Sequence, residues 1–393
     1  MFVKTRLMTP GPTPTAESTR LAVAGALPHH RTPEFAAIAE RALAGLRWLW
    51  DTDDALIIAG SGTAGMEAAL RATVAPGQRL LAVTGGKFAE RWVTVARFIG
   101  ADVTEVNVAW GRSATVADVD AALAGAAPFD ACVMVASETS TGALHPVAAL
   151  IDRVVAHSPD VVTLVDGITA VGCVDLSMRR DRIDLLVSGS QKSFGLPPGA
   201  AVVGVSARAW ARIDQTNAPN YYFDLRKERK QTSAGDFAFT PPIPLVVGFA
   251  EVMGRWQALG REGLFAHAST LSAGTLAGVA ALGLRPFVDG TPSPALTAVA
   301  AIDGVPVPAL RARLAGHYGV DVAGGQDQLK GKMFRIGHLG AVDAFDVLHA
   351  IGALGMSMRD LGRPVDAGAG VAAALEAMAP AMSAAPVVSR YSP

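Results

Sequence analysis

Cysteine and surplus charge are both scarce in this 393-residue sequence. The two cysteines, Cys132 and Cys173, form no CxxC pair and no metal-ligand cluster, so a disulfide framework is excluded and no metal site is expected. The 34 basic residues are matched by 35 acidic ones. Because there is no basic surplus to neutralise phosphates, we do not expect the chain to bind nucleic acid.

Long hydrophobic runs are also missing. No stretch approaches the roughly 18 consecutive apolar residues of a membrane span. Pro10 and Pro12 come before any apolar run, so we expect neither a membrane segment nor a signal peptide. Half of the residues are hydrophobic and 18% are charged, which excludes a disordered chain. Together these features favour a cytoplasmic globular enzyme.

Short apolar runs alternate with helix-like stretches through the first two thirds of the chain. The runs are rich in Val, Leu and Ile without polar alternation, as is typical of strands buried on both faces. The predicted strands are 56–59, 79–83, 103–106, 131–136, 161–165, 185–187 and 201–205. The predicted helices between them include 64–74, 88–99, 116–123 and 146–156. This alternation predicts an α/β fold, with a mostly parallel sheet between helices.

The pattern changes after about residue 206. Residues 217–244 are rich in aromatics, prolines and charges, which predicts a long ordered loop. Residues 245–259 then predict a long helix, and the helices and short strands that follow indicate a second, smaller domain. The expected parts are an N-terminal segment (1–20), a large domain (21–260), a small C-terminal domain (261–379) and a flexible tail (380–393).

A glycine-rich turn follows the first predicted strand, at Gly60-Ser61-Gly62-Thr63-Ala64-Gly65. A strand, a glycine turn and a helix in this order direct backbone N–H groups and the positive helix end toward an anion, and a phosphate suits them. The turn also matches the dinucleotide pattern G-x-G-x-x-G. However, the next strand ends at Thr84-Gly85-Gly86-Lys87 without the carboxylate that would hold a ribose, which disfavours NAD. An ordinary tight turn remains the alternative.

Lys192 and Asp166 stand near the ends of two other predicted strands. A lysine set among small residues and prolines can be desolvated and act as an amine nucleophile, whereas a solvated loop lysine is the alternative. Asp166 ends a buried strand, at the sheet edge where α/β proteins bind ligands, although a structural ion pair is common there. A phosphate turn, a lysine and an aspartate have one joint explanation, pyridoxal 5'-phosphate (PLP).

These residues stand within motifs that resemble the class V aminotransferases of the fold-type I PLP enzymes, and among them the alanine–glyoxylate and serine–glyoxylate group. The resemblance implies a large domain with a mostly parallel seven-stranded sheet and a smaller C-terminal α+β domain. It runs from Thr9 to about Leu375. The motifs are Thr9–Pro14, Ser61–Thr63 with Glu67–Ala69, Gly86–Trp92, Glu138–Gly142, Asp166 with Thr169, Ser188–Lys192 with Pro197–Gly199, Phe239–Pro242 and Phe334–Gly340.

The resemblance implies a role for each motif around the cofactor. Lys192 would form the internal aldimine and move the proton, and Asp166 would pair with the pyridinium nitrogen. The remaining cofactor-binding residues would be Ser61, Gly62, Thr63 and Gln191 at the phosphate, Phe88 stacked on the ring, Ser140 (or its neighbour Thr139 or Thr141) at the phenolic oxygen, and Thr169. Phe88 as a core aromatic is the alternative reading of that residue.

Substrate and partner contacts are implied in the same way. Arg335 would grip the substrate carboxylate in a bidentate fork, unless it serves a structural ion pair. Gly11 and Tyr222 would line a pocket for a small substrate, although Tyr222 could merely pack the loop. Thr240 matches a residue that the partner subunit of a homodimer lends to the phosphate site. Phe237 departs from the family, where some members carry a phosphate-binding tyrosine.

The expected reaction is therefore a transamination from alanine or serine to glyoxylate or pyruvate, through Lys192 in a homodimer with a shared active site. Other class V chemistry remains an alternative, as a lyase, a desulfurase or a pyridoxamine–pyruvate aminotransferase. No cysteine near Lys192 suggests a desulfurase nucleophile. A more distant alternative is an NAD-dependent dehydrogenase that uses the Gly60–Gly65 turn.

Overall fold

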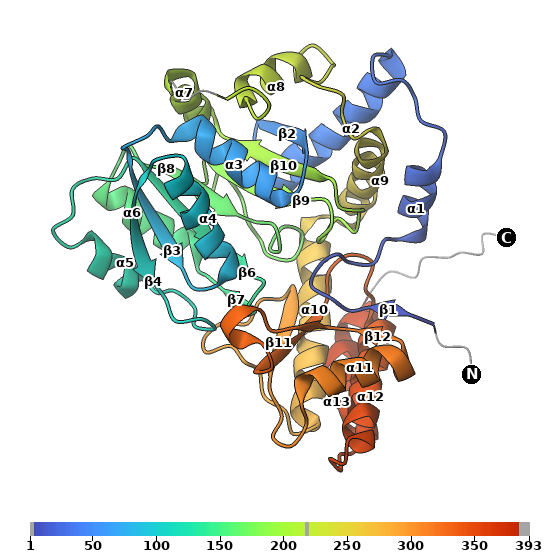
Figure 1. The fold of residues 1–393 in the computed structure, drawn as a ribbon. Helices are drawn as coiled ribbons and strands as arrows, with labels where there is room; N and C mark the ends of the chain where they lie inside the picture. Colours follow the sequence, from blue (N-terminus) through green and yellow to red (C-terminus); the bar gives the residue numbers. More distant parts are fainter. Residues whose placement is uncertain (1–3, 217–219, 385–393) are drawn as a thin grey trace.

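The computed structural model describes residues 4–216 and 220–384. A seven-stranded sheet organises the first two thirds of the chain, in the order β2-β10-β9-β8-β5-β3-β4 (Figure 1). Its strands are β2 (Asp54–Ala59), β3 (Arg79–Thr84), β4 (Asp102–Asn107), β5 (Ala131–Val135), β8 (Val162–Asp166), β9 (Leu185–Gly189) and β10 (Ala200–Val205). All seven predicted strands are confirmed. Every neighbouring pair is parallel except those of β10, which runs antiparallel to β2 and β9.

Helices cover both faces of this sheet, so the strands read as unbroken apolar runs. One hydrophobic cluster joins the first face to α2 (Pro33–Trp50), α5 (Val116–Leu123), α6 (Val147–His157) and α9 (Ile243–Leu259). A second cluster joins the other face to α3 (Gly62–Thr73), α4 (Lys87–Phe98) and α7 (Ala207–Gln215). Successive strand residues point to opposite faces, so Leu56 and Ile58 enter the second cluster while Ile57 enters the first.

The C-terminal part forms a smaller layer of helices on a three-stranded sheet, below the large sheet in Figure 1. Its elements are α10 (Arg261–Ala281), β11 (Leu296–Ala300), α11 (Val307–Tyr318), β12 (Val320–Asp321), β13 (Ala323–Gly324), a 3₁₀ turn (Asp327–Leu329), β14 (Met333–Gly337), α12 (Ala344–Asp360) and α13 (Ala367–Ala384). The proposed domain boundary falls at Gly260, between α9 and α10.

The N-terminal segment belongs to both parts of the fold. Strand β1 (Arg6–Leu7) pairs with β12, and α1 (Glu17–Ala24) packs against α9. The segment between them crosses the sheet edge near Lys192. A short hairpin, β6 (Ser137–Glu138) and β7 (Ala143–Leu144), follows β5 at the same edge.

Two sequence predictions differ from the structure. The predicted loop at 217–244 contains helix α8 (Leu225–Thr232), because Asp224 caps it and Leu225 and Glu228 are buried against the large domain. The predicted tail from residue 380 begins too early, since α13 continues through Pro380 to Ala384. The rest of that tail, 385–393, lies outside the described residues.

Among the described residues, α10 is the one helix with the length and composition to cross a membrane. It packs along α12, α13 and β11. Gly274 and Gly278 allow Met378 and Ile351 to approach its backbone closely, since an added Cβ would lie 2.5 Å and 2.9 Å from those side chains. This is the environment of a helix in a protein core.

Candidate active site

The chemistry-bearing residues meet at one edge of the large sheet. β8 ends at Asp166, β9 ends three residues before Lys192, and β2 ends just before the Gly60 turn. Since β2 and β9 are both antiparallel to β10, their carboxyl ends lie at the same edge as that of β8. The topology therefore brings the three sequence motifs together, as ligand sites of α/β sheets require.

A cavity of about 210 Å³ opens between these strand ends. It is lined by Ser61, Gly62, Thr63, Phe88, Arg91, Val135, Ser137, Thr139, Asp166, Ile168, Gln191 and Lys192. Seven of the predicted site residues are among these twelve. The cavity combines one aromatic ring, one carboxylate, two cations and a helix N-terminus, so it suits a flat molecule that carries both an anionic and a cationic group.

Lys192 is 8% exposed, and its Nζ donates a hydrogen bond to the Pro10 carbonyl at 2.6 Å. A Cβ added at Gly11 would lie 2.5 Å from Nζ, so only glycine permits this approach of the N-terminal segment. Burial lowers the pKa of Lys192 to about 8, and the positive charge of Arg335 adds to the effect. A substantial fraction of the amine is therefore uncharged near neutral pH.

Asp166 is 3% exposed and is held by two donors. The indole Nε1–H of Trp92 donates to Oδ2 at 2.9 Å, and the backbone N–H of Ile168 donates to Oδ1 at 2.9 Å. Burial raises the pKa of Asp166, and these hydrogen bonds oppose that rise. The carboxylate is thus fixed in orientation while lacking a cation in direct contact among the described residues, so it suits a cationic guest.

Helix α3 begins at the cavity without a side-chain cap. Ser61 occupies the cap position, but its hydroxyl accepts no hydrogen bond from the helix. The first N–H groups of a helix have no intrahelical partner, so they remain available to an anion. The buried Oε1 of Gln191 has no hydrogen-bond partner within residues 4–216 and 220–384, and rotating this amide by 180° presents its NH₂ group instead.

Phe88 stands at the start of α4, with its ring centroid 5.9 Å from the Lys192 Nζ. The buried carboxylate of Glu138 accepts hydrogen bonds from the N–H groups of Phe88 (3.2 Å) and Ala89 (3.1 Å), and so caps α4. Gly86 permits the approach, because a Cβ there would lie 2.3 Å from the Glu138 side chain. This contact fixes the ring beside the lysine.

Thr139, and not Ser140, lines the cavity. The Ser140 hydroxyl donates to Glu138 Oε1 at 2.5 Å and accepts from the Lys87 N–H at 3.0 Å, so it belongs to the wall behind Phe88. The Thr139 hydroxyl pairs with that of Thr169 at 2.5 Å. Of the three adjacent hydroxyl residues Thr139, Ser140 and Thr141, Thr139 is therefore the one that lines the cavity.

Arg335 is 5% exposed and does not itself line the cavity, but it contacts a residue that does. Its Nη1 donates to the Thr139 carbonyl at 2.8 Å, while Nε and Nη2 donate to the Gly324 carbonyl at 3.1 and 2.6 Å. Burial lowers the pKa of Arg335 to about 10. Three of its five N–H groups are used, which leaves two for a guest.

Tyr222 and Thr240 do not line the cavity at Lys192. Tyr222 is 45% exposed and stacks on Phe239 at 4.7 Å, and Thr240 is exposed on the segment that follows α8. The expectation that Tyr222 lines the substrate pocket therefore fails for this cavity. Phe237 is buried and packs on Phe35 at 5.9 Å between ring centroids, so its phenyl ring is part of the core of the large domain.

Sequence reasoning assigned no role to Arg91, Trp92 or Glu138. All three lay inside quoted motifs, and Phe88, Arg91 and Trp92 are spaced at i, i+3 and i+4 on one helix face. That spacing was a usable signal, since it places Arg91 and Trp92 on the same side of α4 as the predicted stacking ring.

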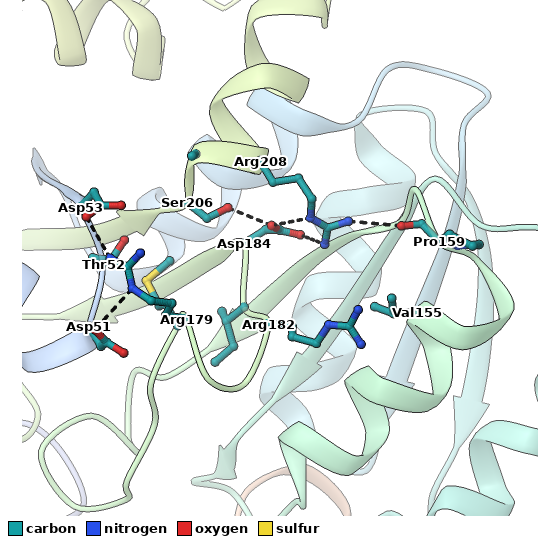
Figure 2. Close-up of a pocket in the computed structure, with 13 residues that line it drawn as sticks. Asp51, Thr52, Asp53, Val155, Pro159, Arg179, Arg182, Asp184, Ser206 and Arg208 are labelled. Carbon is teal, nitrogen blue, oxygen red and sulfur yellow. Dashed lines mark hydrogen bonds and ion pairs between the residues drawn. The ribbon is translucent and has the colours of Figure 1, made fainter.

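A larger hollow of about 420 Å³ lies at the opposite edge of the sheet (Figure 2). Its charges neutralise each other: Arg179 pairs with Asp53 at 2.9 Å, and Arg208 donates to Asp184 from Nε at 3.1 Å. Ser206 also donates to Asp184, at 2.8 Å. The carboxylates there are occupied by protein donors, so this hollow is a structural network, and the cavity at Lys192 is the candidate active site.

Comparison with known proteins agrees with this geometry. Residues 19–340 match the family model "Aminotransferase class-V". The chain is a class V aminotransferase. It is 37% identical to the "Soluble hydrogenase, small subunit" of Synechococcus sp. over 94% of this chain and 97% of that one, and 32% identical to the L-aspartate–glyoxylate aminotransferase of Paracoccus denitrificans over 93% and 94%. The crystal structure of an alanine–glyoxylate aminotransferase from Nostoc sp. superposes with a TM-score of 0.85 at 29% identity, covering 91% and 97%.

The family settles the coarse chemistry. Class V aminotransferases are PLP-dependent enzymes of fold-type I, and they take amino acids and oxoacids as substrates. The predicted fold, cofactor and enzyme class are therefore confirmed for this aminotransferase. The distant alternative, an NAD-dependent dehydrogenase, does not agree with this family.

Proposed function

We propose that this aminotransferase moves the amino group of a small amino acid, alanine or serine, to glyoxylate or pyruvate, with Lys192 as its reactive amine. The observation that carries the proposal is that the Lys192 amine, the Asp166 carboxylate and the open end of α3 face one small cavity. The Synechococcus relative is named as a hydrogenase subunit, which is a different activity. The three groups at this cavity are instead those that bind and activate PLP.

The residues present fit the cofactor. The N–H groups at the uncapped start of α3 and the Gln191 amide are groups that a phosphate satisfies, with Ser61 and Thr63 as hydroxyl donors. Phe88 offers a flat face beside Lys192. Bound PLP supplies an aldehyde that accepts amines and a ring that withdraws electrons from the substrate carbon.

Lys192 acts as nucleophile and proton carrier in this proposal. Its pKa of about 8 makes the amine partly neutral at working pH, which both roles require. The Pro10 carbonyl holds Nζ at 2.6 Å and so restricts where the amine points. Asp166, oriented by Trp92 and Ile168, provides the fixed negative charge that keeps a ring nitrogen protonated.

Arg335 binds the substrate carboxylate in this proposal. The two backbone carbonyls that it contacts hold its guanidinium in place, and one unused N–H remains on each terminal nitrogen, the arrangement needed for a bidentate carboxylate. Since its charge lowers the pKa of Lys192, the two side chains are near neighbours. The cavity at Lys192 is small, about 210 Å³, which favours a small amino donor.

We also propose a homodimer in the cytoplasm, with Thr240 and Tyr222 lent to the partner's active site. Both residues are exposed and neither lines the cavity of its own protomer. Tyr221 beside them is 79% exposed, so an aromatic surface adjoins Thr240. An interface would bury such a surface.

The desulfurase alternative lacks a suitable thiol. Burial raises the pKa of Cys173 to about 11 and that of Cys132 to about 12, whereas a nucleophilic cysteine needs an exposed site and a low pKa. Neither residue lines the cavity at Lys192.

The test is an amino-donor panel with borohydride trapping. Alanine, serine, aspartate and pyridoxamine are offered with glyoxylate or pyruvate, and the visible cofactor band and the products are followed. We expect alanine or serine to bleach the band, borohydride to label Lys192, and Lys192→Ala to lose both. Lys230→Ala, an exposed lysine on α8, is the control and should keep full activity. Labelling elsewhere, or release of many equivalents of oxoacid per active site without an acceptor, would contradict the proposal.

A further inference from the structure

Arg91 is a half-buried cation that lines the cavity without a carboxylate partner. Its Nη1 donates to the Thr63 hydroxyl at 3.1 Å, and its guanidinium carbon lies 4.9 Å from the Phe88 ring centroid. In the described residues, 4–216 and 220–384, no carboxylate lies within 4 Å of its nitrogens. By contrast, Arg71 and Arg97 on neighbouring helical surfaces each pair with a glutamate at 2.7 Å.

The contact with Thr63 determines where that hydroxyl points. A guanidinium can only donate, so Thr63 Oγ1 accepts from Arg91 and must direct its own hydrogen elsewhere. Thr63 is in the first turn of α3, whose free N–H groups face the cavity. Arg91 therefore leaves the Thr63 hydroxyl available as a donor at the anion-binding end of the helix.

The charge balance of the cavity points the same way. Its two basic lining residues are Lys192 and Arg91. The amine of Lys192 reacts with the aldehyde and is not free to pair with the phosphate, and the helix end contributes only about half a positive charge. A phosphate monoester carries nearly two negative charges at neutral pH. Arg91 is the remaining lining side chain that can balance them.

We propose that Arg91 is the cation of the phosphate cradle and a positioning residue for the Thr63 hydroxyl. This inference rests on the proposed function of the cavity as a cofactor site. The competing role is purely structural, in which Arg91 braces the Phe88 ring through a cation–π contact and does not act on phosphate. The two roles differ in their dependence on the phosphate group.

The experiment compares ligands with and without that group. The full-length enzyme is freed of cofactor and titrated with PLP, with pyridoxal, and with inorganic phosphate, the last read by thermal shift. We expect Arg91→Gln to weaken PLP binding about 10- to 100-fold, the range for a charge-assisted hydrogen bond, and to abolish the phosphate-induced shift. Pyridoxal binding should change less than about 3-fold, and Arg91→Lys should recover part of the PLP affinity.

Two further variants sharpen the test. Arg97 is on the same helix but is exposed and paired with Glu105, so Arg97→Gln should leave the binding of all three ligands unchanged. Thr63→Val should weaken PLP binding, and adding Arg91→Gln should cost less than the two separate effects predict, because Arg91 acts partly through Thr63. Equal losses for PLP and pyridoxal, or unchanged PLP binding, would overturn the inference. Failure of borohydride to label Lys192 in the wild type would instead refute the proposed function, and the phosphate readout would still judge the cradle.

Discussion

The pH at which Lys192 becomes reactive is a direct consequence of its surroundings. At pH 7 a lysine with the ordinary pKa of 10.5 is about 0.03% neutral, whereas one with a pKa of about 8 is about 10% neutral. Burial and the charge of Arg335 therefore raise the concentration of reactive amine about 300-fold. We expect the rate at which cofactor-free enzyme recombines with PLP to rise with pH and to level off above a midpoint near 8.

Arg335 provides the perturbation that separates charge from burial. Its positive charge disfavours protonated Lys192, so Arg335→Met should raise the Lys192 pKa and move the recombination midpoint to higher pH. Arg335→Lys keeps the charge and should keep the midpoint. Stopped-flow absorbance across pH 6 to 10 measures both, with circular dichroism to verify the fold. A wild-type midpoint near 10.5, or a shift to lower pH in Arg335→Met, would refute the reasoning.

Three further predictions follow from single contacts. Trp92→Phe removes the indole donor to Asp166 and leaves a buried acceptor unsatisfied. We expect the free energy of unfolding to fall by about 1–3 kcal/mol, measured by urea denaturation, and PLP binding to weaken, measured by titration. Gly86→Ala places a Cβ 2.3 Å from a buried glutamate side chain and should destabilise by about 1–3 kcal/mol, whereas Gly254→Ala, which meets nothing within 4 Å in α9, should be neutral or stabilising; equal effects would contradict this. Burial raises the pKa of Glu228 to about 7, so the folded state binds a proton more tightly than the unfolded chain. The free energy of unfolding therefore falls as pH rises from about 4.5 to 7. Glu228→Gln should make it less dependent on pH, as measured by urea unfolding at pH 5 and pH 8.

The large sheet could be predicted because its strands are buried on both faces. Each strand then reads as an apolar run bounded by turns, and all seven were found. Helix α8 was missed for the opposite reason. Its sequence, LRKERKQT, is almost entirely polar, so it has no apolar periodicity to detect. Its helix-forming residues and the Asp224 cap do indicate a helix, but the many charges and aromatics around them favoured a loop.

The active site divides along the same line. Lys192, Asp166 and the Gly60 turn follow strands, and strand ends meet at one edge by topology, so the sequence could group them. The contacts of Trp92 with Asp166 and of Arg91 with Thr63 come from α4 and depend on how that helix is rotated against the sheet. Such rotation is set by packing, which a single sequence does not reveal.

The network in Figure 2 bears on the active site at the opposite edge, through strand register. A slip of one residue would turn Asp166 to the other face of the sheet, and strands that are apolar on both faces have no polar alternation that opposes it. The amino ends of β8 and β9 are fixed instead by polar contacts: the Thr163 N–H donates to Asp184 Oδ2 at 2.8 Å, and the Asp184 N–H donates to the Thr163 hydroxyl at 3.0 Å. From this point the pairing runs without interruption to Asp166 opposite Val187. The carboxylate of Asp184 is buried and does not line the cavity. By fixing the register of β8 against β9, it determines how Asp166 and Lys192 are placed relative to each other at the cavity.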